Sequence, residues 1–324
     1  MTSDRASDGQ SRGADAPTRT IGTRDDIGAI VAILALGLVF RLIIAYGNPG
    51  SGFKVDIGTF QAWAANLATE GLHGFYERPF FHDYTPGYLY VLTLVGMVGN
   101  AVGGIGDLIK IPAILGDVAL GWLVWSMARE LGAGRRAALV GGFLVVVNPV
   151  SWFDSVLWGQ VDSFGVVFLL LGLRALWRDQ PERSAIYTVI AALIKPQLAI
   201  LAPIVAVVTI RRALWPPRSS PATDADRPEV EQLDDDGLGG GQTGREPGPL
   251  RPRGPAWLAG FHAAERRAGR PIRILTTGIA GFLTAVVLCF PFGLSVLEPG
   301  GPGEVFHSGL IEQVFKTAGG YPFA

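Results

Sequence analysis

The feature that most constrains the fold of this chain is a series of long apolar runs separated by short polar connectors. The first run, 27–46, is about long enough to cross a ~30 Å hydrocarbon core at ~1.5 Å per residue, and it is too long for the apolar core of a secretory signal. Hydrophobic residues make up 49% of the chain and charged residues only 17%. The other runs lie at about 88–103, 109–128, 137–150, 163–177, 184–210 and 273–292. Together they predict an all-α polytopic membrane protein.

Four basic segments predict the orientation, because Lys and Arg in short loops mark the cytoplasmic side of a membrane. They are the N-terminal tail, the connectors 129–136 and 174–183, and the segment that opens at Arg211. With all four inside, the run 88–103 cannot be a full crossing. Its glycines and leading tyrosines suit an interfacial or re-entrant helix on the outer face. One loop that violates the charge rule is the alternative.

The run 184–210 is too long for one comfortable span, and basic connectors flank both of its ends. Pro196 lies near its middle, and proline breaks a helix. Two short helices therefore form a hairpin with Lys195 near its outer tip. The predicted crossings are 27–46, 109–128, 137–150, 163–177, 184–195, 197–210 and 273–292. Several are short, as expected where a cavity reaches into the membrane.

The polar segments outside these crossings divide the chain into parts. The tail 1–26 and the segment 213–272 are too poor in apolar residues to bury a core, so we predict that both are disordered and cytoplasmic. A regulatory or partner-binding role is the alternative for the second segment. Between them, 27–212 forms the transmembrane bundle with a large outer loop at 47–108. The last span leads to another outer loop, 293–324, and a stop in mid-loop is what a fragment of a longer protein would show.

Acidic residues collect on the predicted outer side, and Asp56 is the first candidate among them. It stands just before a segment with the apolar spacing of an amphipathic helix at the membrane interface. The apolar residues at this spacing are Phe60, Trp63, Ala64, Leu67 and Ala68. A carboxylate at a dry membrane surface is suited to take a proton from an acceptor hydroxyl, so Asp56 is a candidate catalytic base. The alternative is that it caps this helix.

Two further outer segments carry candidate substrate-binding residues. In the run DYTPGY, Asp83 and Tyr84 open a turn at the headgroup level, and the acidic side chain is also able to share a metal or a sugar with another aspartate of the loop. In the run SVLWGQVDS, Trp158 and Gln160 combine an aromatic face for C–H groups with an amide for hydroxyls, which favours sugar binding. The alternative for this run is an aromatic-belt turn capped by Asp162.

Charged residues inside or beside the apolar runs need partners, because an isolated charge is costly there. Lys195 is predicted to bind a phosphate or a carboxylate such as Asp162, with snorkelling to the interface as the alternative. Arg41 and Asp117 have predicted depths that match to within roughly 5 Å. We expect them to face each other or a common polar cavity, as a structural pair in preference to a catalytic one.

Taken together, these segments resemble the GT-C superfamily of membrane glycosyltransferases. The runs that carry the likeness are DIGTFQAWAANLATEGLHGFY, DYTPGYLY, KIPAILGDVALGWLVW, NPVSWFDSVLWGQVDS and ALIKPQ. They look like bacterial mannosyltransferases related to the GPI-anchor second mannosyltransferase. The likeness covers about 27–212 and the tail after the last span. This family usually has more than seven spans.

The resemblance implies a polyprenyl-phosphate sugar, commonly mannose, as donor, with inversion at the anomeric carbon. By analogy Asp56 matches the acidic residue of the first loop that is proposed as the base, and Asp162, Gln160 and Lys195 fall in runs that match the family. A phosphodiester is a good leaving group, so a base and a cation beside the phosphate suffice and no cofactor is required. Some relatives use a divalent metal, which stays possible here.

The cation beside the phosphate is predicted to be Lys195, Lys110 or Arg78. The predicted partners are the donor lipid, membrane lipid and an acceptor that is a glycan, a lipid or a protein; no nucleic acid is expected. Abundant Ala, Gly and Arg suggest a GC-rich bacterium, hence the cytoplasmic membrane with the active side outward. Two other classes stay open: a transporter or flippase for a lipid-linked sugar, which broken helices and midplane charges also suit, and an inactive fragment or assembly subunit.

Overall fold

The computed structural model describes residues 24–215, 271–299 and 306–319. Most of these residues are helical, and five helices among them are long and apolar enough to cross a membrane. They are Asp25–Gly47, Gly106–Glu130, Arg135–Trp158, Pro196–Leu214 and Ile272–Phe292. The predicted all-α polytopic membrane class is therefore confirmed. Nearly all of the predicted disordered tail and of the predicted disordered insert lies outside the described residues.

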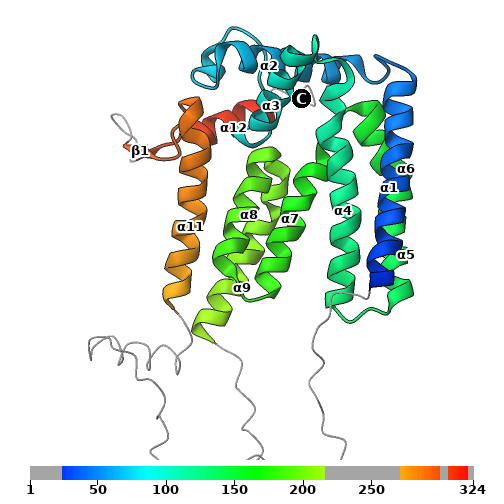
Figure 1. The fold of residues 1–324 in the computed structure, drawn as a ribbon. Helices are drawn as coiled ribbons and strands as arrows, with labels where there is room; N and C mark the ends of the chain where they lie inside the picture. Colours follow the sequence, from blue (N-terminus) through cyan, green and yellow to red (C-terminus); the bar gives the residue numbers. More distant parts are fainter. Residues whose placement is uncertain (1–23, 216–270, 300–305, 320–324) are drawn as a thin grey trace, which may run out of the picture. The chain divides into compact units, whose positions relative to one another are not determined.

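Each apolar run of the sequence forms one or two helices with short extensions, whereas the helices at 54–70 and 309–319 lie outside these runs, the second in the predicted outer loop 293–324 (Figure 1). The α-helices are α1 (Arg24–Gly47), α2 (Lys54–Glu70), α3 (Pro86–Val102), α4 (Ile111–Glu130), α5 (Arg135–Val147), α6 (Pro149–Trp152), α7 (Asp162–Trp177), α8 (Pro181–Ile194), α9 (Leu201–Leu214), α11 (Ile272–Cys289) and α12 (Gly309–Gly319). The 3₁₀ segments are η1 (Phe75–Glu77), η2 (Gly106–Lys110), η4 (Pro196–Ile200) and η6 (Phe290–Phe292), and η3 (Phe153–Trp158) is π-helical. The strands β1 (Glu298–Pro299) and β2 (Phe306–His307) form one short antiparallel pair.

Two stretches are more helical than the sequence indicated. Asp56 lies in the first turn of α2, not before it, so the interpretation as a helix cap is wrong; an acidic residue in a first turn is favoured by the helix dipole. The stretch after α5 is not a short polar loop. The side chain of Asn148 accepts a hydrogen bond from the nitrogen of Val150 at 3.0 Å and caps α6, which η3 continues to Trp158.

The described residues form two compact units. The first unit comprises the residues up to 62 together with 103–167, and the second comprises 63–102 together with the residues from 168 onward. Helices α2 and α7 each begin in the first unit and end in the second. With 16 and 14 residues, α7 and α8 measure ~24 and ~21 Å, less than a ~30 Å hydrocarbon core, so these two predicted crossings are indeed short.

Helices α1, α4 and α5 pack on one another in the first unit. Their shared core consists of Ile30, Leu34, Trp125, Ala138 and Val146. The helices approach closely at Gly142, where an added Cβ would lie 2.8 Å from Cδ1 of Ile30 and 3.2 Å from Cβ of Trp125. The apolar runs therefore bury one side in this bundle and leave the other for lipid.

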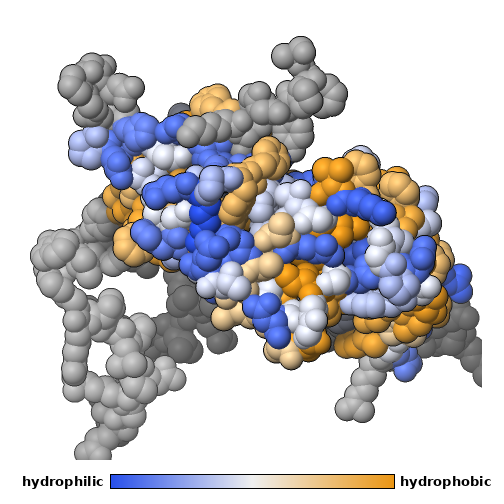
Figure 2. Space-filling model, turned by 90° about the horizontal axis from the view of Figure 1, so that it is seen from above, coloured by the Kyte–Doolittle hydropathy of each residue, from blue (hydrophilic) through white to orange (hydrophobic). Residues whose placement is uncertain are grey.

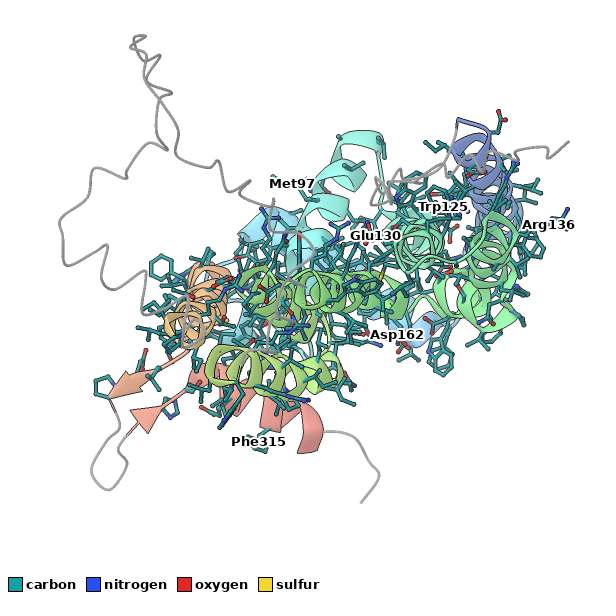
Figure 3. The ribbon with its side chains drawn as sticks, turned by 90° about the horizontal axis from the view of Figure 1, so that it is seen from below. Met97, Trp125, Glu130, Arg136, Asp162 and Phe315 are labelled. Atoms are coloured by element: carbon teal, nitrogen blue, oxygen red, sulfur yellow. The ribbon has the colours of Figure 1, made fainter. Side chains whose placement is uncertain are left out.

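Ion pairs join the helix ends at one end of the first unit. Oδ1 of Asp26, in the first turn of α1, lies 2.6 Å from Nε of Arg135, and Oδ2 lies 3.7 Å from Nη2 of Arg129. Arg136 follows at this end and points away from the helices (Figure 3). The start of α1 and the basic α4–α5 connector thus lie at the same end of the unit.

Polar contacts at one end of the second unit join four helices. Nη1 of Arg273, at the start of α11, lies 2.6 Å from Oδ2 of Asp179, which follows α7. Nη1 of Arg212, in the last turn of α9, lies 3.6 Å from Oδ1 of the same aspartate. Thr276 donates to Oε1 of Glu182, in the first turn of α8, at 2.7 Å. Two of the predicted basic connectors therefore gather at one end of this unit.

The predicted break in the run 184–210 is confirmed. Helix α8 ends at Ile194, Lys195 adopts an extended conformation with φ −142° and ψ 121°, and Pro196 opens η4. The short helix α3 packs on α2, where a Cβ on Gly96 would lie 2.9 Å from that of Ala68. On its other side α3 exposes Met97, which points away from the neighbouring helices (Figure 3).

Candidate active site

The turn after η3 sets the positions of two predicted sugar-binding side chains. η3 ends at Trp158 and is followed by Gly159, which adopts the left-handed conformation with φ 85° and ψ 17°. The backbone nitrogens of Gly159 and Gln160 both donate to the carbonyl oxygen of Asp154, at 2.8 and 3.0 Å. Glycine is the residue that takes up such a conformation readily, so Trp158 and Gln160 flank a turn that is defined by the backbone. π-helical segments recur at functional sites.

Two glycines bring the start of α2 against this turn. A Cβ on Gly52 would lie 2.5 Å from the carbonyl oxygen of Leu157, and a Cβ on Gly159 would lie 2.6 Å from Cγ1 of Ile57. Neither position has room for a side chain. The backbone that leads into α2 therefore packs directly on the end of η3, which carries Asp56 to the η3 turn.

Asp56 is the residue on which the two segments converge. Nε1 of Trp158 donates to Oδ2 of Asp56 at 2.7 Å, and Nε2 of Gln160 donates to the same oxygen at 2.6 Å. Within the described part of the chain, Oδ1 receives no hydrogen bond, and the residue is half-buried. One carboxylate oxygen is thus anchored, and the other is able to accept a proton.

An aromatic groove adjoins the carboxylate in the first unit. Phe53 and Phe153 each meet Trp158 edge to face, with ring centroids 6.1 and 6.4 Å apart. The three rings are between 45% and 52% exposed and, with Gly52 and Leu157, line a groove of about 400 Å³. Hydrophilic side chains are frequent on the molecular face viewed from above, with hydrophobic ones interspersed and around its edge (Figure 2). Apolar rings beside a few polar groups are typical of sites for small ligands.

A buried ion pair anchors the loop that precedes α2, and sequence reasoning did not assign it. Nζ of Lys110 lies 2.8 Å from Oδ1 of Asp107 and donates to the carbonyl oxygen of Ser51 at 2.8 Å. Oδ2 of Asp107 accepts from the nitrogen of Gly50 at 3.0 Å. Lys110 is fully buried, so it is structural and does not supply the cation predicted beside the phosphate. The i, i+3 spacing of the two residues was the signal available in the sequence.

Asp162 is the first residue of α7, and it is exposed (Figure 3). The helix start is held by its neighbours: Oγ of Ser163 donates to the carbonyl oxygen of Ala113 at 3.2 Å, and a Cβ on Gly116 would lie 2.7 Å from the nitrogen of Phe164. An acidic residue in the first turn suits the helix dipole. The position therefore fits both the helix-start alternative and an accessible substrate-binding carboxylate.

The DYTPG run and the break at Lys195 meet in the second unit. Oγ1 of Thr85 donates to the carbonyl oxygen of Leu193 at 2.7 Å, and both residues are buried. Asp83 and Tyr84 immediately precede this contact along the chain, and Lys195 follows it by two residues. The structure therefore brings these three predicted site residues into one region, where Lys195 is half-buried.

Arg78 has a structural role in the loop after α2. Its guanidinium donates to Oδ1 of Asn66 and to the carbonyl oxygens of Gly71 and His73, the last two at 2.8 and 3.1 Å. Its Nε also lies 3.5 Å from Oε2 of Glu70. The prediction of Arg78 as a phosphate-binding cation is therefore not supported, because loop carbonyls occupy its donors.

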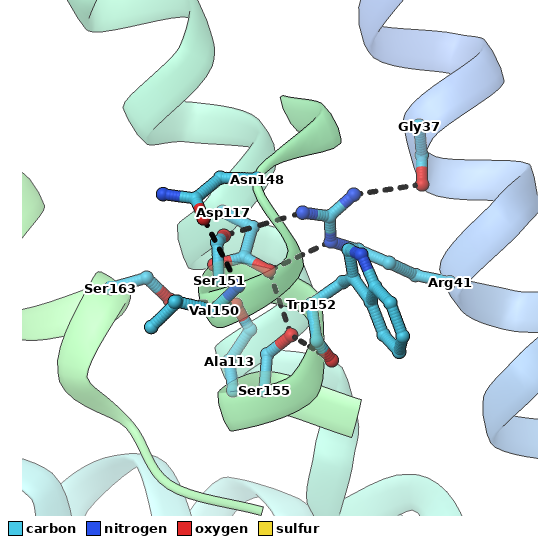
Figure 4. Close-up of polar contacts among 10 residues, drawn as sticks. All are labelled: Gly37, Arg41, Ala113, Asp117, Asn148, Val150, Ser151, Trp152, Ser155 and Ser163. Carbon is cyan, nitrogen blue, oxygen red and sulfur yellow. Dashed lines mark hydrogen bonds and ion pairs between the residues drawn. The ribbon is translucent and has the colours of Figure 1, made fainter. Parts of the chain in front are cut away.

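The intramembrane pair predicted from matching depths is in contact (Figure 4). Nε of Arg41 lies 2.7 Å from Oδ2 of Asp117, and both side chains are almost completely buried. The guanidinium also donates to the carbonyl oxygen of Gly37 at 3.2 Å and to Oγ of Ser151 at 3.3 Å, and Ser155 donates to Oδ2 of Asp117 at 2.7 Å. The two serines were not predicted. The pair is shielded and hydrogen-bonded, which suits a structural role.

Residues 82–211 match a family described as alpha-(1->6)-mannopyranosyltransferase, N-terminal domain. No curated protein and no solved structure matches the chain. This match, together with the apolar helices of the bundle, supports a GT-C-like membrane glycosyltransferase. Within that class the chain is a mannosyltransferase, as the resemblance predicted. The match contains the DYTPGYLY, WGQVDS and ALIKPQ runs, whereas Asp56 and Arg41 lie outside it.

Proposed function

We propose that this mannosyltransferase moves mannose from a polyprenyl-phosphate carrier to an acceptor hydroxyl on the outer face of the bacterial cytoplasmic membrane, with Asp56 as the base. The observation that carries the proposal is the geometry of that carboxylate. Trp158 and Gln160 hold Oδ2, and Oδ1 receives no hydrogen bond from the described residues. The family match supports the reaction class and leaves the carrier and the base as our proposal.

In the proposed step, Oδ1 of Asp56 takes the proton of the acceptor hydroxyl while the hydroxyl oxygen attacks the anomeric carbon. The bond from that carbon to the phosphate oxygen breaks, and its electron pair leaves with polyprenyl phosphate. Attack from the opposite face inverts the anomeric centre. No general acid is needed, because the departing phosphate is stable as an anion.

Charge on the departing phosphate is proposed to be stabilised by Lys195. This assignment is supported by the place of Lys195, which is half-buried at the break after α8, two residues beyond the contact of Leu193 with Thr85 of the DYTPG run. We further propose that Asp83, Tyr84 and Asp162 bind sugar hydroxyls.

Among the described residues, no three His, Cys, Asp or Glu side chains gather as metal ligands. We propose transfer without a resident metal, and a divalent ion remains the alternative that chelation with EDTA tests.

The proposed orientation places the N-terminus in the cytoplasm. Its support lies in the first unit, where Asp26 pairs with Arg135 and brings the start of α1 to the basic α4–α5 connector. Basic connectors mark the cytoplasmic side. Asp56 follows the opposite end of α1, which would then face outward.

The test is transfer from radiolabelled polyprenyl-phosphate mannose in membranes that contain the wild type or the Asp56→Asn variant. Loss of a general base lowers the rate by about a hundredfold to ten-thousandfold. Asp25→Asn is the matched control, because Asp25 is an exposed acidic residue at the start of α1. Wild-type transfer by Asp56→Asn would refute the assignment of the base.

A further inference from the structure

A groove between α8, α9 and α11 in the second unit has no part in the proposed transfer. It encloses about 270 Å³ and is lined by small and β-branched side chains, among them Ala185, Ala206, Thr209, Thr277, Gly278 and Gly281. Along α9 it extends from Ala202 to Ile210, about 12 Å at ~1.5 Å per residue. Because α9 and α11 belong to candidate spans and Ala206 and Gly278 are exposed, the groove opens toward lipid.

One end of this groove is strongly basic. Contacts of Asp179 and Glu182 gather the end of α7, the start of α8, the end of α9 and the start of α11 there. The arginines of these four helix ends are Arg174, Arg178, Arg183, Arg211, Arg212 and Arg273. Among the described residues of these four helix ends, six are arginines and two are acidic, so positive charge is in excess at the end where the groove residues Ile210 and Ile274 lie.

Two groove residues carry hydroxyls that lack a partner. Thr209 and Thr277 are 4% and 8% exposed, and neither Oγ1 has a hydrogen-bond partner among the described residues. Thr277 lies one turn from Arg273 on α11, and Thr209 lies three residues from Arg212 on α9, which corresponds to ~6 and ~4.5 Å along the helices. A ligand at this place therefore meets cations first, then hydroxyl donors, then an apolar channel.

We propose that the groove binds one acyl chain of an anionic glycerophospholipid. The phosphate lies against the arginines, an ester carbonyl accepts a hydrogen bond from Thr209 or Thr277, and the chain follows the small residues of α9 and α11. Basic pockets between membrane helices are suited to anionic headgroups. A glycerophospholipid has these three chemistries in this order, whereas a polyprenyl phosphate has no ester carbonyl.

A second copy of the chain fits the groove less well. Small residues also serve as contact points between membrane helices. In a symmetric pair within one membrane, however, the same end of each copy meets its counterpart. The basic ends would then face each other, so the charge favours an anionic lipid.

The experiment titrates the full-length chain in neutral detergent micelles with phosphatidylglycerol and measures bound lipid by native mass spectrometry. Phosphatidylcholine, diether phosphatidylglycerol and polyprenyl phosphate are the comparison probes. We expect phosphatidylglycerol to bind most tightly and the diether lipid to bind more weakly. The double variant Thr209→Val with Thr277→Val should abolish the difference between the ester and ether forms. Arg211→Gln weakens binding about fivefold, the value of one arginine at a membrane surface.

The decisive variant is Gly278→Leu, which fills the groove; a Cβ at this position meets no atom within 4 Å, so the helices need not move. Binding weakens about tenfold or more, since burying roughly two methylenes is worth that factor. Gly28→Leu on α1 is the control, because its Cβ is equally free of neighbours. The proposal would be overturned if Gly278→Leu bound phosphatidylglycerol as tightly as the wild type, or if phosphatidylcholine bound as tightly as phosphatidylglycerol. It would also be overturned if polyprenyl phosphate displaced phosphatidylglycerol at a lower concentration than phosphatidylglycerol itself, or if the chain formed a dimer that Gly278→Leu dissociates. The readout is binding, so it is independent of whether Asp56 is the base.

Discussion

The indole nitrogen of Trp158 lies 2.7 Å from Oδ2 of Asp56, although 102 residues separate the two in the sequence. Gln160 donates to the same oxygen at 2.6 Å, so both donors engage one oxygen and leave the other. The donors flank a glycine turn and the carboxylate begins a helix, so their meeting depends on how closely two backbone segments pack. A base held in this way keeps a fixed direction toward its proton donor.

Removal of the donors to this carboxylate should lower transfer without unfolding the protein. A hydrogen bond to a charged group contributes roughly 1.5–3 kcal/mol, so Trp158→Phe and Gln160→Leu should each reduce kcat/KM by about tenfold or more. Transfer rates and thermal unfolding in micelles are the measurements. Trp215→Phe is the control, because Trp215 is 68% exposed at the end of α9. An unchanged rate in both variants would show that the tether is unimportant.

Gly159→Ala should destabilise the protein more than Gly132→Ala does. Both glycines have a positive φ, 85° and 86°, so both variants incur a strain of ~1–2 kcal/mol. Only at Gly159 would the new Cβ also meet Ile57, at 2.6 Å, which adds ~1–3 kcal/mol of overpacking. Thermal unfolding measures the difference. In an Ile57→Ala background, Gly159→Ala should cost less stability than it does in the wild type; an equal cost in both backgrounds would contradict the packing argument.

Breaking the buried pair of Arg41 and Asp117 should be far more harmful than breaking an exposed one. Arg41→Met leaves Asp117 buried without its charge partner, at a cost of about 3–5 kcal/mol. The double variant Arg41→Met with Asp117→Leu should be less destabilised than the single one. Glu70→Gln is the exposed control, expected at ~0–1 kcal/mol. Unfolding midpoints and the yield of folded protein test this, and a milder loss in Arg41→Met than in the double variant would contradict it.

The orientation is testable with single cysteines in a Cys289→Ala background. Ile105 and Ala133 lie beside opposite ends of α4 in the first unit. An impermeant maleimide added to intact cells should label Ile105→Cys, and Ala133→Cys should react only after permeabilisation. Labelling of Ala133→Cys alone would reverse the proposed sidedness.

Some of the site was accessible from the sequence because the cause is local. Pro196 cannot continue a helix, so the break beside Lys195 followed from one residue. The contact of Arg41 with Asp117 followed from their depths, because an isolated charge within an apolar bundle is costly and two opposite charges at the same depth can pair.

Other features could not be predicted because they depend on approach between distant segments. The hydrogen bonds to Asp56 form only because Gly52 and Gly159, which lack side chains, let the segment before α2 pack directly on the end of η3. No pattern in either segment indicates that it contacts the other. Lys110 was a candidate for the phosphate because a lysine in an outer loop is normally free. Only the fold shows it fully buried against Asp107.

By itself, then, the sequence determined that this protein is an α-helical membrane protein, where its apolar helices lie, and the mannosyltransferase class it resembles. It did so because every backbone polar group within lipid must be bonded inside its own segment, which makes long apolar runs helical whatever their neighbours are. The tertiary structure alone decided which polar side chains are held in structural contacts and which are accessible to a substrate. That choice depends on contacts between residues far apart in the chain, such as Trp158 with Asp56, whose energy comes from burial and pairing together.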